Sequence, residues 1–236
     1  MGEPLVFLPG LMADARMFLP QIVGLGANWT SQVCLVTHGE TVEDNSQFVL
    51  DQAPARFALI GHGLGGAVAL DVLRRAAERV TRVVLMSTPP LSETPQAAMA
   101  RETRIVAARS GRLAEAMAEE IPQDTLADTQ WRGDVLALVT DMALGLGEGV
   151  FVRQSRAMQR RPDQQKTMRR IKIPALIMAG QADTLMPPKR QEFTAGLIPY
   201  GKLCIIPDAG HLPSLEQPDL VTDAIADFLN GPILLR

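Results

Sequence analysis

The sequence predicts an α/β protein with a mostly parallel central sheet flanked by helices. Short runs of four to six nearly all-apolar residues alternate with helical patterns, as expected for strands buried on both faces. One long helical block interrupts this alternation between the fourth and fifth strands. At 236 residues, with 47% apolar and 21% charged residues, the chain can form one large domain with a substantial core.

Six strands are expected, each bounded by turn residues. In chain order they are Leu5–Leu8, Gln32–Val36, Phe57–Ile60, Arg82–Met86, Ala175–Ala179 and Lys202–Ile206. The clearest helix is predicted over Gly66–Arg79, where apolar residues form one face. A last helix follows Pro218, because Val221, Ile225 and Phe228 recur at helical spacing.

The helical block runs from about Ser92 to Arg170 and contains no convincing strand. Gly111, Pro122 and Gly133 divide it into several helices. We interpret residues 92–170 as an inserted helical lid, and residues 1–91 together with 171–236 as the core. A lid closes a pocket and excludes water.

Composition and charge limit the kinds of partner. A net charge of −3 gives no reason to expect nucleic acid or an anionic membrane. The N-terminus lacks a signal pattern, and no apolar stretch reaches the roughly 20 residues that span a bilayer. The two cysteines, Cys34 and Cys204, lie in apolar runs and are expected to be buried free thiols. We expect a cytoplasmic protein that acts on a small molecule.

The segment Gly61-His62-Gly63-Leu64-Gly65-Gly66 has two incompatible interpretations. As G-x-G-x-x-G between a strand and a helix, it is typical of a dinucleotide-binding turn. That site needs an acidic residue about 20 positions later, at the end of the next strand. Met86-Ser87-Thr88-Pro89-Pro90 offers neither an acid nor an arginine there. Dinucleotide binding is therefore a remote alternative.

The other interpretation is a G-x-S-x-G nucleophile elbow in which glycine stands at the serine position. Such a sharp turn needs small residues on both sides of the nucleophile, here Gly61 and Gly65, and Gly66 allows the helix to pack closely. The nucleophile sits in a strained backbone conformation that glycine adopts freely. Gly63 would therefore keep the turn and remove the hydroxyl group.

Two loops supply the partners that such a nucleophile requires. Asp183 follows the fifth predicted strand and His211 follows the sixth, so both lie at the carboxyl-terminal edge where open α/β sheets build sites. The order nucleophile, acid, histidine also fits. The alternatives are an ordinary turn aspartate and a surface histidine. His38 and His62 are expected to be structural, and three scattered histidines predict no metal site. Ser87 and Ser214 lack an elbow context.

Together with Phe7-Leu8-Pro9-Gly10-Leu11, these motifs make nearly the whole chain resemble the α/β-hydrolase superfamily. The resemblance is to small bacterial carboxylesterases such as the pimeloyl-carrier-protein methyl ester esterases. It implies that Asp183 is the catalytic acid, that His211 is the base, and that the backbone N–H groups of Leu11 and Leu64 form the oxyanion hole. It implies no cofactor. Two departures are Pro9-Gly10 in place of the usual His-Gly, and the absent serine at position 63.

We therefore expect a carboxylic-ester hydrolase scaffold, inactive or strongly impaired as it stands. Three explanations are open: serine was removed from a working enzyme, the protein is a natural ligand-binding pseudohydrolase, or water attacks with His211 as general base. The substrate would be a small ester or related acyl compound. Eight basic residues against one acid lie between Arg153 and Lys172. Such a run is either a solvated helix face or a landing site for an anionic substrate or an acidic carrier protein on the lid.

Overall fold

The computed structural model describes residues 2–233 and contains one six-stranded sheet in the order β2-β1-β3-β4-β5-β6. Every strand pairing among these residues is parallel. This arrangement confirms the predicted fold class. The strands are β1 (Leu5–Leu8), β2 (Ser31–Val33), β3 (Phe57–His62), β4 (Val80–Met86), β5 (Ala175–Gly180) and β6 (Gly201–Ile206).

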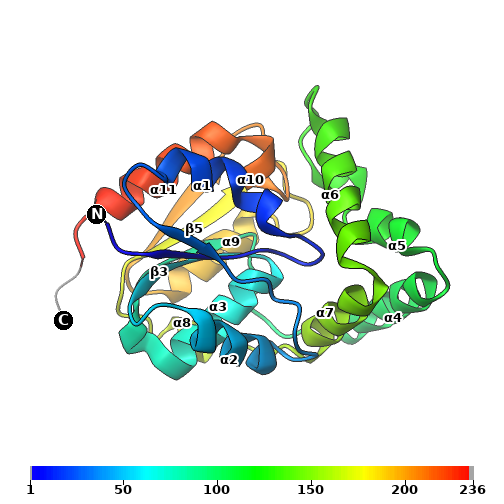
Figure 1. Ribbon diagram of the computed structural model, residues 1–236, viewed down its shortest axis with the longest axis horizontal. Coiled ribbons are helices and arrows are strands. Elements are labelled where there is room, and N and C mark those ends of the chain that lie inside the picture. The colour runs from blue at the N-terminus through cyan, green and yellow to red at the C-terminus, as the bar shows by residue number, and fades with distance from the viewer. Residues whose placement is uncertain (1, 234–236) are drawn as a thin grey trace.

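Helices cover both faces of the sheet (Figure 1). One face carries α1 (Leu19–Leu25), α10 (Pro213–Glu216) and α11 (Pro218–Asn230). The other carries α2 (Val42–Gln52), α3 (Leu64–Ala76), α8 (Gln165–Met168) and α9 (Pro188–Leu197). Because successive strand residues point to opposite faces, Leu5 and Phe7 join the first core cluster, whereas Val6 and Leu8 join the second.

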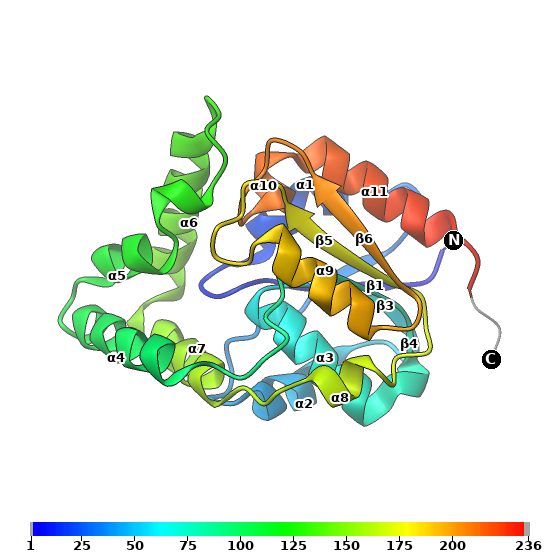
Figure 2. The same cartoon turned by 180° about the vertical axis from the view of Figure 1, so that it is seen from behind.

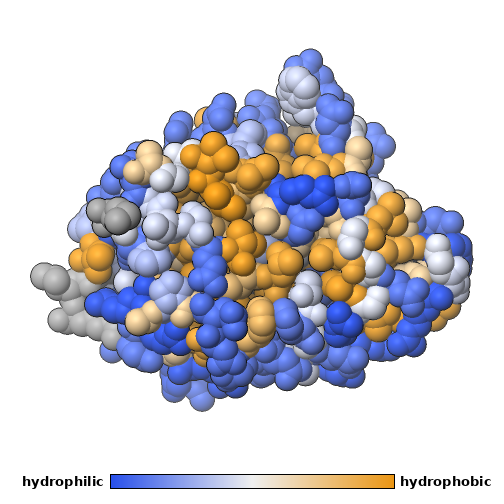
Figure 3. All heavy atoms as spheres, viewed as in Figure 1, coloured by the Kyte–Doolittle hydropathy of each residue, from blue (hydrophilic) through white to orange (hydrophobic). Residues whose placement is uncertain are grey.

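Four further helices lie between β4 and β5 in the sequence, and Figures 1 and 2 show them gathered to one side of the sheet. They are α4 (Pro95–Arg109), α5 (Leu113–Glu120), α6 (Arg132–Leu146) and α7 (Glu148–Arg160). We call α4–α7 the helical insertion. The short helix α8, in contrast, packs beside α3. On the face seen in Figure 3, apolar side chains are exposed both over the core and over the insertion.

The second predicted strand is the element that differs most from its prediction. It was expected over Gln32–Val36, but β2 ends at Val33. Cys34 and Val36 are still buried, and the Cys34 N–H still donates to the Phe7 carbonyl over 3.0 Å. The Val36 carbonyl instead accepts a hydrogen bond of 3.0 Å from the Gln154 side chain of α7. This hydrogen bond joins segments that are 118 positions apart in the sequence, which a strand pattern cannot reveal. Both cysteines are free, but Cys204 is only half-buried.

Within residues 2–233, no single helix is long and apolar enough to cross a bilayer. The helices α6 and α7 meet that requirement only as a pair, and they are bent by 102° relative to each other.

Candidate active site

The turn between β3 and α3 brings Gly63 to the carboxyl end of the sheet in a left-handed conformation. Gly63 has φ 51° and ψ −113°, its N–H donates to the Met86 carbonyl over 3.0 Å, and its carbonyl accepts the first helical hydrogen bond from Ala67. A residue with a Cβ atom adopts such a conformation only at a cost of about 1–3 kcal/mol. This is the strained turn that the sequence predicts for a nucleophile elbow.

Glycines on either side of Gly63 are required by close packing. A Cβ atom on Gly61 would lie 2.7 Å from the Gly65 carbonyl oxygen, and one on Gly65 would overlap the Leu8 carbonyl oxygen. A Cβ atom on Gly66 would overlap Thr88 Oγ1. Gly63 itself is different, because a Cβ atom there would meet only the Cα atom of Gly10, at 4.0 Å. Space for a side chain is therefore present at the one position where the elbow needs one.

Asp183 lies in the loop after β5 and is almost completely buried. Its Oδ1 accepts hydrogen bonds from the backbone N–H groups of Leu185 (3.0 Å) and Met186 (2.8 Å), and its Oδ2 accepts one from Ser87 Oγ (2.8 Å). Burial alone would raise the pKa of Asp183, but the hydrogen bond and charge of His211 and these other donors hold it below its ordinary value. The carboxylate is thus kept ionised and fixed in orientation.

His211 lies in the loop after β6, with Nδ1 3.0 Å from Asp183 Oδ2. The Nδ1–H group therefore donates to the carboxylate, which leaves Nε2 able to accept a proton. The His211 N–H donates to the Thr125 carbonyl of the helical insertion over 2.8 Å. The structure thus brings Asp183 and His211 together as the sequence predicts.

The buried carboxylate of Glu216 fixes the loop that carries His211. It accepts hydrogen bonds from the N–H groups of Gly210 (2.9 Å) and Leu212 (2.8 Å), on both sides of the histidine. It also accepts one from Ala127 of the insertion (2.8 Å). Sequence analysis missed Glu216. Its only signal is an acidic residue within the apolar stretch that follows the histidine.

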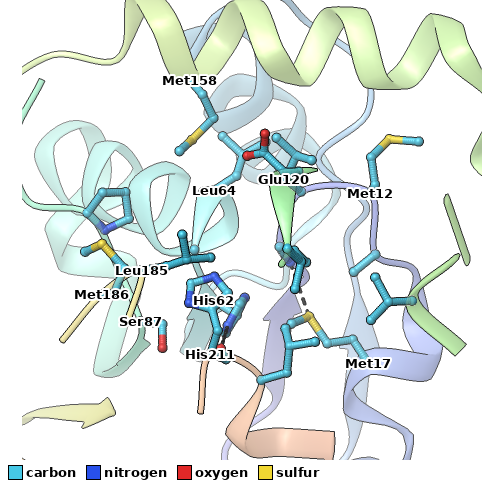
Figure 4. A pocket seen from close by; sticks show the side chains of 18 of the residues that line it. Met12, Met17, His62, Leu64, Ser87, Glu120, Met158, Leu185, Met186 and His211 are labelled. Carbon is cyan, nitrogen blue, oxygen red and sulfur yellow. Dashed lines mark hydrogen bonds between the residues drawn. The ribbon is translucent and has the colours of Figure 1, made fainter. Parts of the chain in front are cut away.

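His62 lies under this loop, and its ring is next to that of His211, with the ring centroids 5.2 Å apart (Figure 4). Its Nε2–H donates to the His211 carbonyl over 2.8 Å, whereas its buried Nδ1 has no partner among the described residues. Burial, reinforced by the charge of His211, lowers the pKa of His62 to about 3 from an ordinary 6.5. His62 therefore stays neutral and serves to position the loop.

This shift predicts a stability loss in acid. Unfolded chains protonate His62 below about pH 6.5 while the folded protein does not, so stability falls as the pH drops from 6.5 toward 3. Between about pH 7.5 and about pH 5, His62 should contribute roughly 2 kcal/mol of this loss. Urea unfolding at both pH values should show a loss smaller by that amount for His62→Asn. Equal losses in the two proteins would contradict this assignment.

Two backbone N–H groups in the pocket that contains Gly63 are without an acceptor among residues 2–233. Leu64 is the first residue of α3, and Leu11 follows Gly10 in the loop after β1. Neither the Leu11 N–H nor the Leu64 N–H has an acceptor among the hydrogen bonds of residues 2–233. Both residues line the same pocket as Gly63 and His211. Free backbone N–H groups, here with that of Leu64 at a helix N-terminus, are suited to hold a developing negative oxygen.

The pocket has a volume of about 280 Å³ and lies between the loops at the sheet edge and the helical insertion. Figure 4 shows His62, His211 and Ser87 among apolar side chains that include Met12, Met17, Met158 and Met186. Among residues 2–233, no group of three or more His, Cys, Asp or Glu side chains is placed to hold a metal ion.

Ser87 acts on the site through Asp183. It is fully buried just after β4, and its hydroxyl group donates to the carboxylate. The Ser87 hydroxyl group therefore helps to hold the Asp183 carboxylate in place.

The basic run from Arg153 to Lys172 does not form one face. Arg156 pairs with Glu102, Arg160 with Glu40 and Arg161 with Glu93. The residues Lys166, Arg169, Arg170 and Lys172 line a separate groove beside the end of α3. Of the eight basic residues, only Arg161 lines the pocket that contains Gly63.

The sequence profile of the Alpha/beta hydrolase family matches residues 5–224. The chain belongs to this family. A pimeloyl-[acyl-carrier protein] methyl ester esterase of Aromatoleum aromaticum is 28% identical over 240 residues, which cover 94% of this chain and 91% of that protein. Among solved structures, an esterase of Thermogutta terrifontis superposes with a TM-score of 0.88 at 26% identity, covering 97% and 90% of the two chains. An enol-lactonase of Burkholderia xenovorans has a TM-score of 0.85 at 23% identity, covering 98% and 93%, and shares the fold. The chain is therefore an esterase-like α/β hydrolase.

Proposed function

We propose that the chain carries the site of a serine-type carboxylic-ester hydrolase from which only the nucleophile is missing. One observation carries this proposal: the elbow keeps its left-handed backbone at Gly63 and leaves space there for a side chain. The Asp183–His211 pair beside it is in hydrogen-bonding geometry. The names of the esterase relatives support an ester as the substrate class.

The remaining groups have defined roles in the parent reaction. A serine at position 63 would attack the ester carbonyl, while His211 Nε2 takes its proton and Asp183 holds the imidazole in the required tautomer. The backbone N–H groups of Leu11 and Leu64 would donate to the oxyanion. Water would then hydrolyse the acyl-enzyme with His211 as base. With glycine at position 63 no acyl-enzyme can form.

The helical insertion serves this site as a lid. Its side chains close the pocket from the side opposite the sheet, and it is held to the catalytic loop by the Thr125 carbonyl and the Ala127 N–H. Closure by these contacts would exclude water from the pocket and strengthen the electrostatic interactions inside it.

A second candidate function rests on the same open space. The volume left by the absent side chain adjoins His211, so a water molecule held there could attack an ester directly with His211 as general base. A pocket without turnover would instead bind its ligand as a pseudohydrolase. If the site only lacks its nucleophile, the unaltered chain should hydrolyse esters barely above background. If water attacks instead, its kcat should approach the ~10 s⁻¹ typical of enzymes.

Hydrolysis of short and medium p-nitrophenyl esters by the unaltered chain and by Gly63→Ser tests the proposal. A large gain for Gly63→Ser supports it, and substantial turnover by the unaltered chain favours attack by water. Inactivity of both proteins, with ligand binding retained, would favour the pseudohydrolase.

A further inference from the structure

Five charged side chains of the helical insertion and its flanks form part of the wall of the otherwise largely apolar pocket. They are Glu93, Arg101, Arg104, Glu120 and Arg161, which we call the charged wall. Their side chains are only 3–15% exposed. Burying charge is costly unless it is paired. A charged side chain of the wall that lacks hydrogen-bond partners within the protein is therefore available to bind a ligand.

Arg101 and Arg161 each donate several hydrogen bonds within the protein. Arg101 donates to Glu93 through Nε and Nη2 and to Glu120 through Nη1, at 2.8–3.3 Å. Arg161 donates to Glu93 over 3.1 Å and to the backbone carbonyls of Leu91 and Met158. Although burial would raise the pKa of Glu93, the hydrogen bonds and charges of the two arginines lower it below its ordinary value. Glu93 therefore remains an ionised partner for both.

Arg104 is the exception. Its Nε lies 2.7 Å from Glu120 Oε2, but the two groups are not aligned for a hydrogen bond. No side-chain or backbone acceptor among residues 2–233 takes a hydrogen bond from the Arg104 guanidinium. A guanidinium has five N–H donors in a planar fork. Arg104 thus presents a largely unused fork at the pocket, with its side chain 15% exposed.

The charges of the wall do not cancel. Three guanidinium groups face two buried carboxylates, Glu93 and Glu120, which leaves an excess of one positive charge. Glu119 also borders the pocket, but it is exposed, so solvent screens its charge. Within residues 2–233, Arg104 is the one guanidinium of the charged wall that donates no hydrogen bond, so it is the best placed of the three to bind an anion.

We propose that Arg104 binds a carboxylate on the substrate, so that the preferred ester carries a second, anionic end. This inference rests on the proposed function, which places the ester group of the substrate beside Gly63 and His211. A carboxylate matches the guanidinium fork and neutralises the excess charge of the wall. The pocket of about 280 Å³ contains both His211 and Arg104 and is small for a ligand site. The substrate class is thus a short monoester of a dicarboxylic acid, or the corresponding lactone with a carboxylate.

The test measures binding with the unaltered chain, which should not consume the ligand. Monomethyl esters of dicarboxylic acids, from succinic to suberic acid, are compared with their neutral dimethyl esters by calorimetric titration at neutral pH. We expect at least one monoester to bind about tenfold or more tightly than its dimethyl ester, as charge-assisted hydrogen bonds allow. Because Arg104 is mostly buried, that preference should persist from about 0.1 M to about 1 M salt. Equal affinities across the series would overturn the proposal.

Variants of two arginines on α4 test whether Arg104 causes the preference for the monoester. Arg104→Gln should abolish the preference for the monoester, whereas Arg109→Gln should leave it unchanged, because Arg109 lies on the same helix but is exposed and outside the pocket. Arg104→Lys keeps the charge and should retain part of the preference, which separates loss of the site from a general folding defect. A preference that survives Arg104→Gln would also overturn the proposal.

The two proposals can fail separately. If Gly63→Ser stays inactive while the monoester preference persists, the esterase proposal fails and the anion site stands. If Gly63→Ser hydrolyses charged and neutral esters with equal kcat/KM and neither binds preferentially, the anion site fails and the esterase proposal stands.

Discussion

Replacing Gly63 by serine is expected to raise kcat for p-nitrophenyl esters by several orders of magnitude. Removing the nucleophile of a serine hydrolase costs about 10⁶ in kcat, so adding it to a site with the other groups in place should recover a large part of that factor. The structure permits the change, since a Cβ atom at this position meets only the Gly10 Cα atom, at 4.0 Å. The positive φ should lower the free energy of unfolding by about 1–3 kcal/mol, which thermal melting would detect.

Gly63→Ala is the matched control for this gain. It adds the same Cβ atom and imposes the same backbone cost, but it supplies no hydroxyl group. Its ester hydrolysis should equal that of the unaltered chain. A folded Gly63→Ser with no more activity than Gly63→Ala would mean that Asp183 and His211 are not poised for serine chemistry.

Within the Gly63→Ser background, Asp183→Asn should lower kcat by about 10⁴, the cost of a wrong histidine tautomer in a serine triad. The carboxylate accepts from His211 Nδ1 and is held by three other donors. An asparagine whose oxygen keeps the Leu185 and Met186 donors would place its NH₂ group where Oδ2 now faces His211 and Ser87. The NH₂ group would then donate to Nδ1, so the proton of His211 would move to Nε2, which could no longer act as base.

Asp208→Asn provides the matched control for that loss. Asp208 lies in the loop before His211 but is exposed, and asparagine tolerates its positive φ of 51°. The esterase activity of Gly63→Ser should be unaffected by it. Comparable losses for the two aspartates would point to a disturbed loop and contradict the role assigned to Asp183.

The strands and catalytic loops could be predicted from sequence because local patterns determine them. Apolar runs such as Ala175–Ala179 predict strands in the interior of a sheet, and the carboxyl ends of parallel strands bring Asp183 and His211 to one edge. The end of β2 could not be predicted, since the Val36 carbonyl bonds to the side chain of Gln154, which lies 118 positions later.

Other parts of the site depend on contacts between distant segments. Glu216 accepts a hydrogen bond from the Ala127 N–H group, 89 positions away, and this partner is not visible in the local pattern. The guanidinium of Arg104 keeps free donors because its neighbour Glu120 is shared with Arg101, and the sequence does not show this pairing. Charge counting along the chain instead singled out the run from Arg153 to Lys172, most of which lies outside the pocket.

The most direct test of the vacant-nucleophile account is covalent labelling by a fluorophosphonate, followed by intact mass and peptide mapping. Such a reagent reacts with a hydroxyl group that is activated by a histidine and stabilised by an oxyanion hole. We expect one adduct on Gly63→Ser, mapped to residue 63, none on the unaltered chain, and loss of the adduct when His211→Ala is added. A folded Gly63→Ser that takes up no label, or an adduct on Ser87 in both proteins, would contradict it.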